Sequence, residues 1–329
     1  MQKIVLFNCE DQQDLTLERQ MTHGMEIELE LCNHQPDEAL AEVCRDADAV
    51  ITIYSTVDEN VLHQLRRCQV VAVQAIGFNN LDLQAATANG ICLANVPDFC
   101  LYDVALHTVA LTLSCARHIV SLDHQVKQGK WGYTGHVMRR LSGQVFGMIA
   151  FGNIPRTLVP MLKPFGLHCM AYAPHTPDEI LKQYGVERAQ TLEDLLVASD
   201  YLSIHCPLRL SNISLISTRE LALLKSSAFL INTARGRIVD EQALCRALKT
   251  GQIAGAALDV LETEKDGDNP LYHFDNVIVT PHTAFYSEQS MRDMRLKALG
   301  QVLSVLQEKK APSHLLNPDV LKNARFLSW

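Results

Sequence analysis

Hydrophobic and polar positions along the chain follow two alternating patterns. Short apolar runs bounded by polar residues are typical of buried parallel strands. In the first hundred residues such runs predict strands at 4–7, 26–31, 49–53, 70–74 and 91–94. Segments of helical character separate them, among them 38–45, 61–67 and 83–89. The alternation predicts a parallel sheet covered by helices.

A second alternation of the same kind follows a long helical stretch. The sequence predicts one helix from Asp103 to about Gln128, ending at Gly129. The strands predicted after it are 144–151, 168–172, 201–205, 229–232, 255–259 and 277–280. A helix and a tail are predicted from Ser287 onward. The fold class that follows is α/β, with two Rossmann/flavodoxin-like parallel-sheet domains and a cleft between them.

Composition and charge narrow the class of protein. The chain has 329 residues, 47% hydrophobic and 20% charged, which suits two domains of ordinary size. A net charge of −8 without a long basic run argues against direct binding of nucleic acid. The first apolar run is too short for a signal peptide, and no segment is long enough to span a membrane. The ten cysteines form no CxxC pair and no metal-type spacing, so we expect a cytoplasmic protein without a metal site.

Arg235 is the residue at which the sequence most strongly indicates chemistry. It follows the predicted strand 229–232 and precedes Gly236. Ligands of open α/β sheets bind at the carboxyl ends of the strands. A permanently charged, forked donor at that edge suits a carboxylate or a 2-oxo acid. The alternative is a structural arginine that pairs with a nearby carboxylate and holds a turn.

Gly152 lies in a candidate phosphate-binding turn between a predicted strand and a predicted helix. A dinucleotide fingerprint has three glycines in such a turn, and this chain keeps only the middle one, which lets the backbone approach a pyrophosphate. The amides of Asn153 and Ile154 could still face a phosphate. An ordinary strand-to-helix turn is the alternative interpretation.

Ala173 occupies the position at which a carboxylate usually binds the cofactor ribose. That acidic residue normally follows the glycines by about twenty positions. Its absence removes repulsion against a 2′-phosphate, yet no arginine follows directly to receive one. His175, Lys182 and Arg209 are candidates to approach it. The residues therefore leave the choice between NAD and NADP open.

Several separated motifs agree in their order and spacing with one known family. They are Ala75-Ile76-Gly77-Phe78-Asn79-Asn80-Leu81-Asp82, Asn95-Val96-Pro97, Gly129-Lys130-Trp131, Asn232-Thr233-Ala234-Arg235-Gly236, Ala257-Leu258-Asp259-Val260 and Thr280-Pro281-His282. Along nearly its whole length the chain resembles the D-isomer-specific 2-hydroxyacid dehydrogenases. The stretch from His282 to Gln289 is most similar to the C-terminal-binding-protein branch, the dehydrogenase-like transcriptional co-repressors and their bacterial relatives. That branch usually has tryptophan where this chain has Phe285.

The resemblance implies a catalytic trio. Arg235 would bind the carboxylate and the 2-oxo group of the substrate, and His282 would protonate the ketone oxygen as hydride arrives. Glu264 would pair with His282, and its spacing within the family favours it over Glu262. Physical chemistry supports these roles, because a neighbouring carboxylate favours the protonated imidazole and an arginine offsets oxyanion charge.

The resemblance also implies binding residues. Asp259 would bond the nicotinamide carboxamide, and the backbone amides of Ile76 and Gly77 would bind the substrate carboxylate. The expected cofactor-binding residues are Gly152, Asn153, Ile154, Ala173, His175, Cys206, Pro207, Thr233, Ala234, Asp259 and His282. The expected substrate-binding residues are Tyr54, Ile76, Gly77, Arg235 and Phe285.

The implied function is NAD(P)-dependent hydride transfer between nicotinamide and a small 2-oxo acid or D-2-hydroxy acid, with NAD slightly favoured over NADP. Residues 1–98 with 290–329 would form the substrate-binding domain, and residues 99–289 the dinucleotide-binding domain. We expect a homodimer in which residues 128–141 cross between subunits. Two alternatives remain open, namely a dinucleotide-sensing regulator of the C-terminal-binding-protein type and a phosphoglycerate dehydrogenase.

Overall fold

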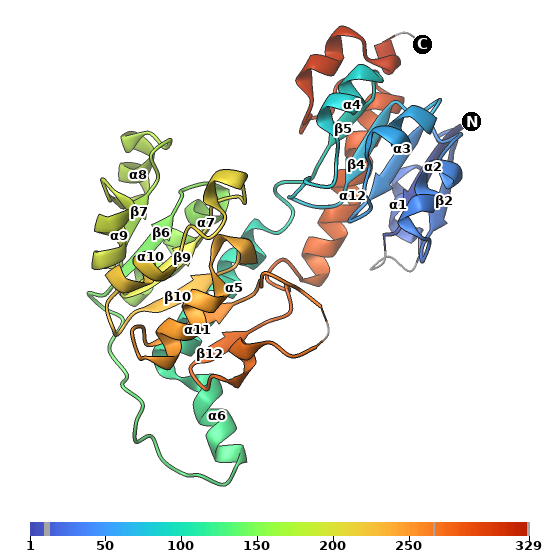
Figure 1. The fold of residues 1–329 in the computed structure, drawn as a ribbon. Helices are drawn as coiled ribbons and strands as arrows, with labels where there is room; N and C mark the ends of the chain where they lie inside the picture. The colour runs from blue at the N-terminus through green and yellow to red at the C-terminus, as the bar shows by residue number, and fades with distance from the viewer. Residues whose placement is uncertain (10–13, 266, 328–329) are drawn as a thin grey trace. The chain divides into compact units, whose positions relative to one another are not determined.

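The computed structural model describes residues 1–9, 14–265 and 267–327 (Figure 1). The chain divides into two compact units. Unit 1 comprises Met1–Cys100 and Ser287–Trp329, and unit 2 comprises Leu101–Tyr286. Which unit binds the substrate and which binds the dinucleotide stays a prediction.

Unit 1 is built on a five-stranded parallel sheet in the order β2-β1-β3-β4-β5. Its strands are β1 Gln2–Phe7, β2 Ile27–Cys32, β3 Ala49–Thr52, β4 Val70–Val73 and β5 Cys92–Ala94. Its helices are α1 Thr16–Met21, α2 Leu40–Val43, α3 Glu59–Gln64, α4 Leu83–Ala88 and α12 Glu288–Leu306. This strand order is that of flavodoxin-like folds.

Both faces of the unit 1 sheet are covered. On one face Val50, Val71 and Leu93 pack against buried residues of α2, α3 and α4. The other face is covered by α12, which contacts β3, β4 and α1 (Figure 1). Strands β3, β4 and β5 are therefore buried along their whole length, which explains why the sequence shows them as continuous apolar runs.

Unit 2 is built on a seven-stranded parallel sheet in the order β12-β11-β10-β9-β6-β7-β8. Its strands are β6 Val145–Ile149, β7 His168–Tyr172, β8 Glu187–Arg188, β9 Tyr201–Ile204, β10 Phe229–Asn232, β11 Gly255–Leu258 and β12 Val277–Val279. Its helices are α5 Leu101–Arg117, α6 Ile119–Lys127, α7 Asn153–Leu162, α8 Asp178–Tyr184, α9 Leu192–Ala198, α10 Thr218–Leu223 and α11 Glu241–Lys249. The order reverses between β6 and β9, which is the switch point of a Rossmann fold.

Two hydrophobic layers cover the two faces of the unit 2 sheet, and β10 contributes to both. Leu230 packs in the layer that contains buried residues of α9, α10 and α11. Phe229 and Ile231 pack in the opposite layer, with α5 and α7. The alternation of side chains along a strand explains this division. The predicted α/β class with two parallel-sheet domains is confirmed.

The prediction of one helix from Asp103 to Gln128 is wrong. The structure has two helices, α5 and α6, bent by 60° at a break between them. His118 at the break has a left-handed backbone with φ of 51°. Neither glycine nor proline marks the position, and the imidazole contacts the carbonyl of Val137 at 3.3 Å from its Nε2. The break between α5 and α6 is therefore accompanied by a contact between residues distant in sequence. The local pattern of residues does not indicate this break.

The predicted ranges leave out several observed elements, among them an edge strand and a short helix. The edge strand β8 has only two residues, and α1 is a short helix before β2. In the described part of the chain, no single helix is long and apolar enough to cross a membrane. The bent pair α5–α6 passes that test only when its two helices are combined, by length and composition.

The cysteines behave mainly as small apolar side chains. Seven of the ten cysteines are buried. Burial raises the pKa of Cys9 and Cys115 to about 12, so these thiols stay protonated and unreactive at neutral pH. Most of the cysteines therefore fill the core.

Candidate active site

The predicted cofactor residues of unit 2 lie at one edge of its sheet. Each follows the carboxyl end of a strand, and in a parallel sheet these ends share an edge. Gly152 follows β6, Ala173 follows β7, Cys206 follows β9, Thr233 follows β10, Asp259 follows β11 and His282 follows β12. The turns after β6 and β9 flank the switch point, where doubly wound folds bind their ligands.

Gly152 leaves open space at the start of α7. A β carbon placed on this residue would meet no atom within 4 Å, and Asn153 begins the helix. The first amides of a helix have no partner within it and attract anions. Ala150 has φ of 75°, the backbone region for which a fingerprint uses its first glycine. The turn therefore fits the pyrophosphate of a dinucleotide although two of the three glycines are missing.

The turn that carries Arg235 is shaped by Asn232, the last residue of β10. The buried Asn232 side chain accepts a hydrogen bond from the amide of Ala234 at 3.0 Å and donates one to the carbonyl of Arg235 at 3.0 Å. Gly236 then packs against the backbone of Leu261, where a β carbon would lie 1.9 Å from the carbonyl group. These contacts hold Arg235 at the strand end and beside the loop after β11.

Within the described residues, Arg235 is held by a backbone hydrogen bond and not by an ion pair. Its Nη1 donates to the carbonyl of Ala234 at 2.6 Å. Within residues 1–9, 14–265 and 267–327, no carboxylate lies within ion-pair distance of the guanidinium. The structural alternative considered for Arg235, a turn held by a carboxylate, is therefore not supported. Its charge is available for an anionic ligand.

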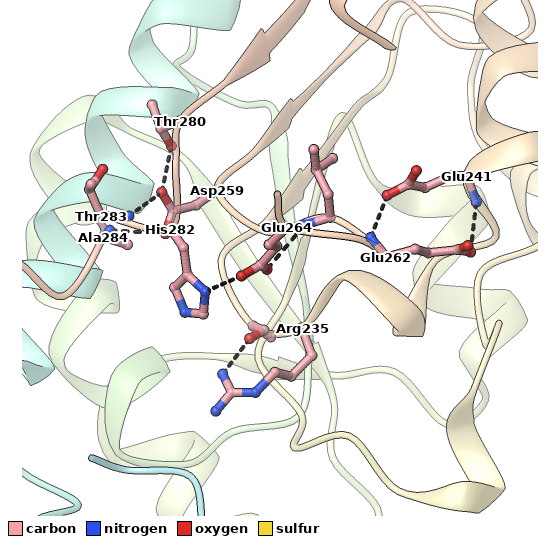
Figure 2. A network of polar contacts seen from close by, with 11 residues as sticks. Arg235, Glu241, Asp259, Glu262, Glu264, Thr280, His282, Thr283 and Ala284 are labelled. Carbon is pink, nitrogen blue, oxygen red and sulfur yellow. Dashed lines mark hydrogen bonds and ion pairs between the residues drawn. The ribbon is translucent and has the colours of Figure 1, made fainter. Parts of the chain in front are cut away.

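His282 and Glu264 form the central pair of the site (Figure 2). Nδ1 of His282 lies 2.7 Å from Oε2 of Glu264, and each side chain is 40% exposed. An ionised carboxylate can only accept, so Nδ1 carries the proton in this pair. Nε2 is then the nitrogen that can deliver or take a proton. Figure 2 shows Arg235 next to this pair.

The environment of Glu264 keeps its carboxylate ionised. Burial alone raises its pKa, but the hydrogen bond and charge of His282, the amide of Leu261 and the charge of Arg235 together lower it below the ordinary value. The Leu261 amide donates to Oε1 at 3.3 Å. Glu262 is differently placed, because its carboxylate accepts from the amide of Glu241 and its own amide donates to the Glu241 carboxylate (Figure 2). The geometry thus pairs Glu264, and not Glu262, with the histidine.

Asp259 holds the loop that carries His282. Its carboxylate accepts from the Thr280 hydroxyl at 2.6 Å and from the amides of Thr283 and Ala284, both at 2.9 Å (Figure 2). Its carbonyl accepts from the amide of His282 at 2.8 Å. The residue is 1% exposed, so its charge is stabilised by these donors. His282 itself has φ of 52°, a strained conformation that this network maintains. A bond from Asp259 to nicotinamide stays a prediction.

Thr280 and His107 extend this network, and no role at the site was predicted for either residue. Nε2 of His107, on α5, lies 3.1 Å from the Thr280 hydroxyl and 3.6 Å from the Asp259 carboxylate. The Thr280 proton is donated to Asp259, so His107 donates to Thr280. In the sequence, the polar residues around Thr280-Pro281-His282 were the only indication of this network. His107, the partner on α5, is distant in sequence, so no local pattern connects it with them.

The remaining predicted cofactor residues have varied surroundings. Ala173 is buried and His175 is exposed. Asn212 contacts the thiol of Cys206 and donates to the carbonyl of Pro207 at 2.8 Å. Thr233 shares a hydrogen bond of 3.2 Å with Thr108 of α5. All of these residues lie in loops at the carboxyl ends of strands, and their contact with a cofactor stays a prediction.

Three of the predicted substrate residues belong to unit 1. Tyr54 follows β3 and is 67% exposed, whereas Ile76 and Gly77 follow β4. Asn95 donates to the carbonyl of Ile76 at 2.7 Å and so orients that loop. Phe285 belongs to unit 2, where its ring lies edge-on to His282 with centroids 6.2 Å apart. Their contact with a substrate stays a prediction.

Comparison with known proteins identifies the family. The family model of the D-isomer specific 2-hydroxyacid dehydrogenase NAD binding domain matches residues 109–284. A glyoxylate reductase of Aeropyrum pernix is 39% identical over 87% of this chain and 88% of its own length. A D-3-phosphoglycerate dehydrogenase of Methanocaldococcus jannaschii is 33% identical over 89% of this chain, which spans only 56% of that relative.

A solved structure supports the same grouping. The apo-structure of D-lactate dehydrogenase from Escherichia coli superposes with a TM-score of 0.81 and 26% identity, over 95% of this chain and 99% of the other. The C-terminal-binding-protein branch in particular is not singled out by these comparisons. The chain belongs to the D-isomer specific 2-hydroxyacid dehydrogenase family.

Proposed function

We propose that this protein is an NAD(P)-dependent reductase that converts a small, unphosphorylated 2-oxo acid into its D-2-hydroxy acid. The observation that carries the proposal is the Arg235 guanidinium, which forms no ion pair with a described carboxylate, beside the His282–Glu264 pair. The guanidinium suits the carboxylate of such a substrate, and the histidine–glutamate pair suits proton delivery to its ketone oxygen.

The residues divide the chemistry between them. Arg235 binds and orients the substrate through its fixed fork of donors, and its charge offsets the charge that develops on the ketone oxygen. His282 donates a proton from Nε2, and Glu264 stabilises the protonated imidazole before that transfer. When bound, the nicotinamide cofactor supplies the hydride. In the oxidative direction His282 takes the proton back.

The proposed substrate class is small and without a second anion. Relatives named glyoxylate reductase match this chain over most of both lengths. Phe285 gives the imidazole of His282 an apolar neighbour, which suits a short neutral substituent better than a phosphate. Glyoxylate and 2-oxo acids with short apolar side chains are therefore the first substrates to test.

We also propose that the protein acts as a cytoplasmic homodimer. The exposed fractions of Trp131, Tyr133 and Val137 are 92%, 78% and 65%, and α6 before them has no buried residue. Figure 1 shows α6 and the segment after it extending away from the sheet of unit 2. Aromatic residues exposed in such an extension are typical of an interface. Free cysteines suit a reducing compartment.

The test is turnover by the purified protein with NADH and with NADPH against a panel of 2-oxo acids, followed at the nicotinamide absorbance. We expect turnover with glyoxylate or a short 2-oxo acid. The variant Arg235→Ala should lose about 1,000-fold in kcat/KM while still binding the dinucleotide. Arg237→Ala is the matched control, because Arg237 is exposed and only two residues away. Dinucleotide binding without any turnover would overturn the proposal and favour a dinucleotide-sensing regulator.

A further inference from the structure

The loop after β7, residues 173–177, lacks the acidic residue that normally binds the adenosine ribose. Ala173 is at that position and is 3% exposed, so a small apolar side chain fills the space. The rest of this ribose loop is Pro174, His175, Thr176 and Pro177, which contains no carboxylate. A nucleotide ribose at this strand end therefore meets a loop without negative charge of its own.

Arg188 anchors the ribose loop, and its role was not predicted from the sequence. It lies on the edge strand β8, where its backbone is paired with Ala171 of β7. Its guanidinium donates to the carbonyl of Ala173 at 2.9 Å, to the carbonyl of Thr176, and to the carboxylate of Asp178. Three bonds from one planar group hold the loop in a single conformation.

Asp178, which borders the ribose loop in sequence, is paired with the arginine that anchors the loop. Asp178 is the first residue of α8, and its carboxylate forms an ion pair with Arg188. The carboxylate of Asp178 is thus offset by the positive charge of Arg188. In a loop with an acidic strand end, the carboxylate bonds the ribose hydroxyls and repels a 2′-phosphate. Here that repulsion is missing, while the pair of Arg188 and Asp178 adds no net charge.

We propose that the ribose loop does not discriminate against a 2′-phosphate, so that the protein binds NADPH and NADH with affinities within about tenfold of each other. The inference rests on the proposed function, since it concerns the same dinucleotide site. It decides a choice that the sequence leaves open, and it assigns Arg188 as the residue that shapes the site.

The test is direct measurement of dissociation constants for NADH and NADPH by fluorescence titration, without any substrate. We expect a ratio within about tenfold for the natural chain. Ala173→Asp should weaken NADPH by about 100-fold or more, because a carboxylate close to the 2′-phosphate repels it, and should leave NADH unchanged or tighter. A preference beyond about 100-fold for either nucleotide in the natural chain would overturn the inference.

Two further variants separate charge from packing. Ala173→Asn has the size of the aspartate without its charge, so it should keep the natural ratio of the two affinities. His175→Asp adds a carboxylate at an exposed position of the same loop, where folding is not at risk, and should also weaken NADPH selectively. Equal effects of Ala173→Asp and Ala173→Asn on NADPH would contradict the electrostatic argument. Failure to bind both NADH and NADPH would overturn the proposed function as well. Tight binding of NADH without binding of NADPH would overturn only this inference.

Discussion

Gly236 and Leu261 pack backbone against backbone, with no room between them for a side chain. This contact joins the turn of Arg235 to the loop that leads to Glu264. We expect Gly236→Ala to lower the free energy of unfolding by about 3 kcal/mol or more, because a β carbon would overlap the Leu261 carbonyl. Urea denaturation followed by circular dichroism measures this. An unchanged midpoint would show that the two loops separate easily.

Gly152 contrasts with Gly236, because there is room for a side chain at this position. A β carbon on it meets no atom within 4 Å, so Gly152→Ala should change the free energy of unfolding by less than about 1 kcal/mol. The same methyl group would point into the space proposed for the pyrophosphate, and we expect the dissociation constant for NADH to rise about tenfold or more. Fluorescence titration tests this, and unchanged NADH affinity would exclude Gly152 from the binding turn.

The Glu264–His282 pair predicts a pH effect. With Glu264→Gln, kcat for reduction should fall about 100-fold, because a neutral amide no longer favours the protonated imidazole. Because the pKa of Glu264 is lowered, the natural chain should keep its ionised carboxylate into mildly acidic solution, and Glu264→Gln should lack the fall of the rate that protonation of Glu264 causes at still lower pH. Glu262→Gln is the control and should keep both the rate and its pH profile, since Glu262 bonds with Glu241 instead. Equal losses in the two variants would remove the special role of Glu264.

His205, directly after β9, predicts a pH dependence of stability. Burial lowers its pKa from 6.5 to about 3, so the folded chain keeps this imidazole neutral. Its Nε2 shares a hydrogen bond of 2.9 Å with Ser203. The unfolded chain takes up the proton below pH 6.5, so stability falls as pH drops from 6.5 toward 3. Between pH 7 and pH 5 the loss from this residue is about 2 kcal/mol.

The variant His205→Gln isolates that contribution. Its own stability at pH 7 can differ from that of the natural chain, but the change between pH 7 and pH 5 should be smaller by about 2 kcal/mol. His23→Gln is the control, because it replaces an exposed histidine instead of a buried one. Urea midpoints at the two pH values provide the comparison. Parallel pH curves for the natural chain and His205→Gln would contradict the prediction.

Much of the fold could be predicted because buried parallel strands leave a continuous apolar signal. Strands such as β4 and β10 were predicted within a residue of their observed ends, and the positions of Arg235 and His282 after strands followed from them. The two-residue strand β8 is too short for any periodicity. The break at His118 depends on a left-handed backbone that no glycine or proline announces.

Only those residues of the site that belong to local sequence motifs were predicted. Family spacing distinguished Glu264 from Glu262, and the geometry pairs Glu264 with His282. The supporting contacts were not visible, because they join elements far apart in sequence. His107 reaches Thr280 across 173 positions, and Arg188 reaches Ala173 from a neighbouring strand. Such contacts depend on the direction in which each side chain points. No periodic pattern of residues in a single sequence indicates that direction.

The division of the chain into units also has a consequence for its synthesis. Unit 2 is one continuous segment, whereas unit 1 needs both Met1–Cys100 and Ser287–Trp329. The five strands of unit 1 leave the ribosome before unit 2, but α12, which covers one face of their sheet, leaves only after unit 2. Throughout translation of unit 2 that apolar face lacks its covering helix. The newly made chain is therefore most exposed to aggregation and to chaperone binding at its first sheet, while the segment that carries the site can already fold.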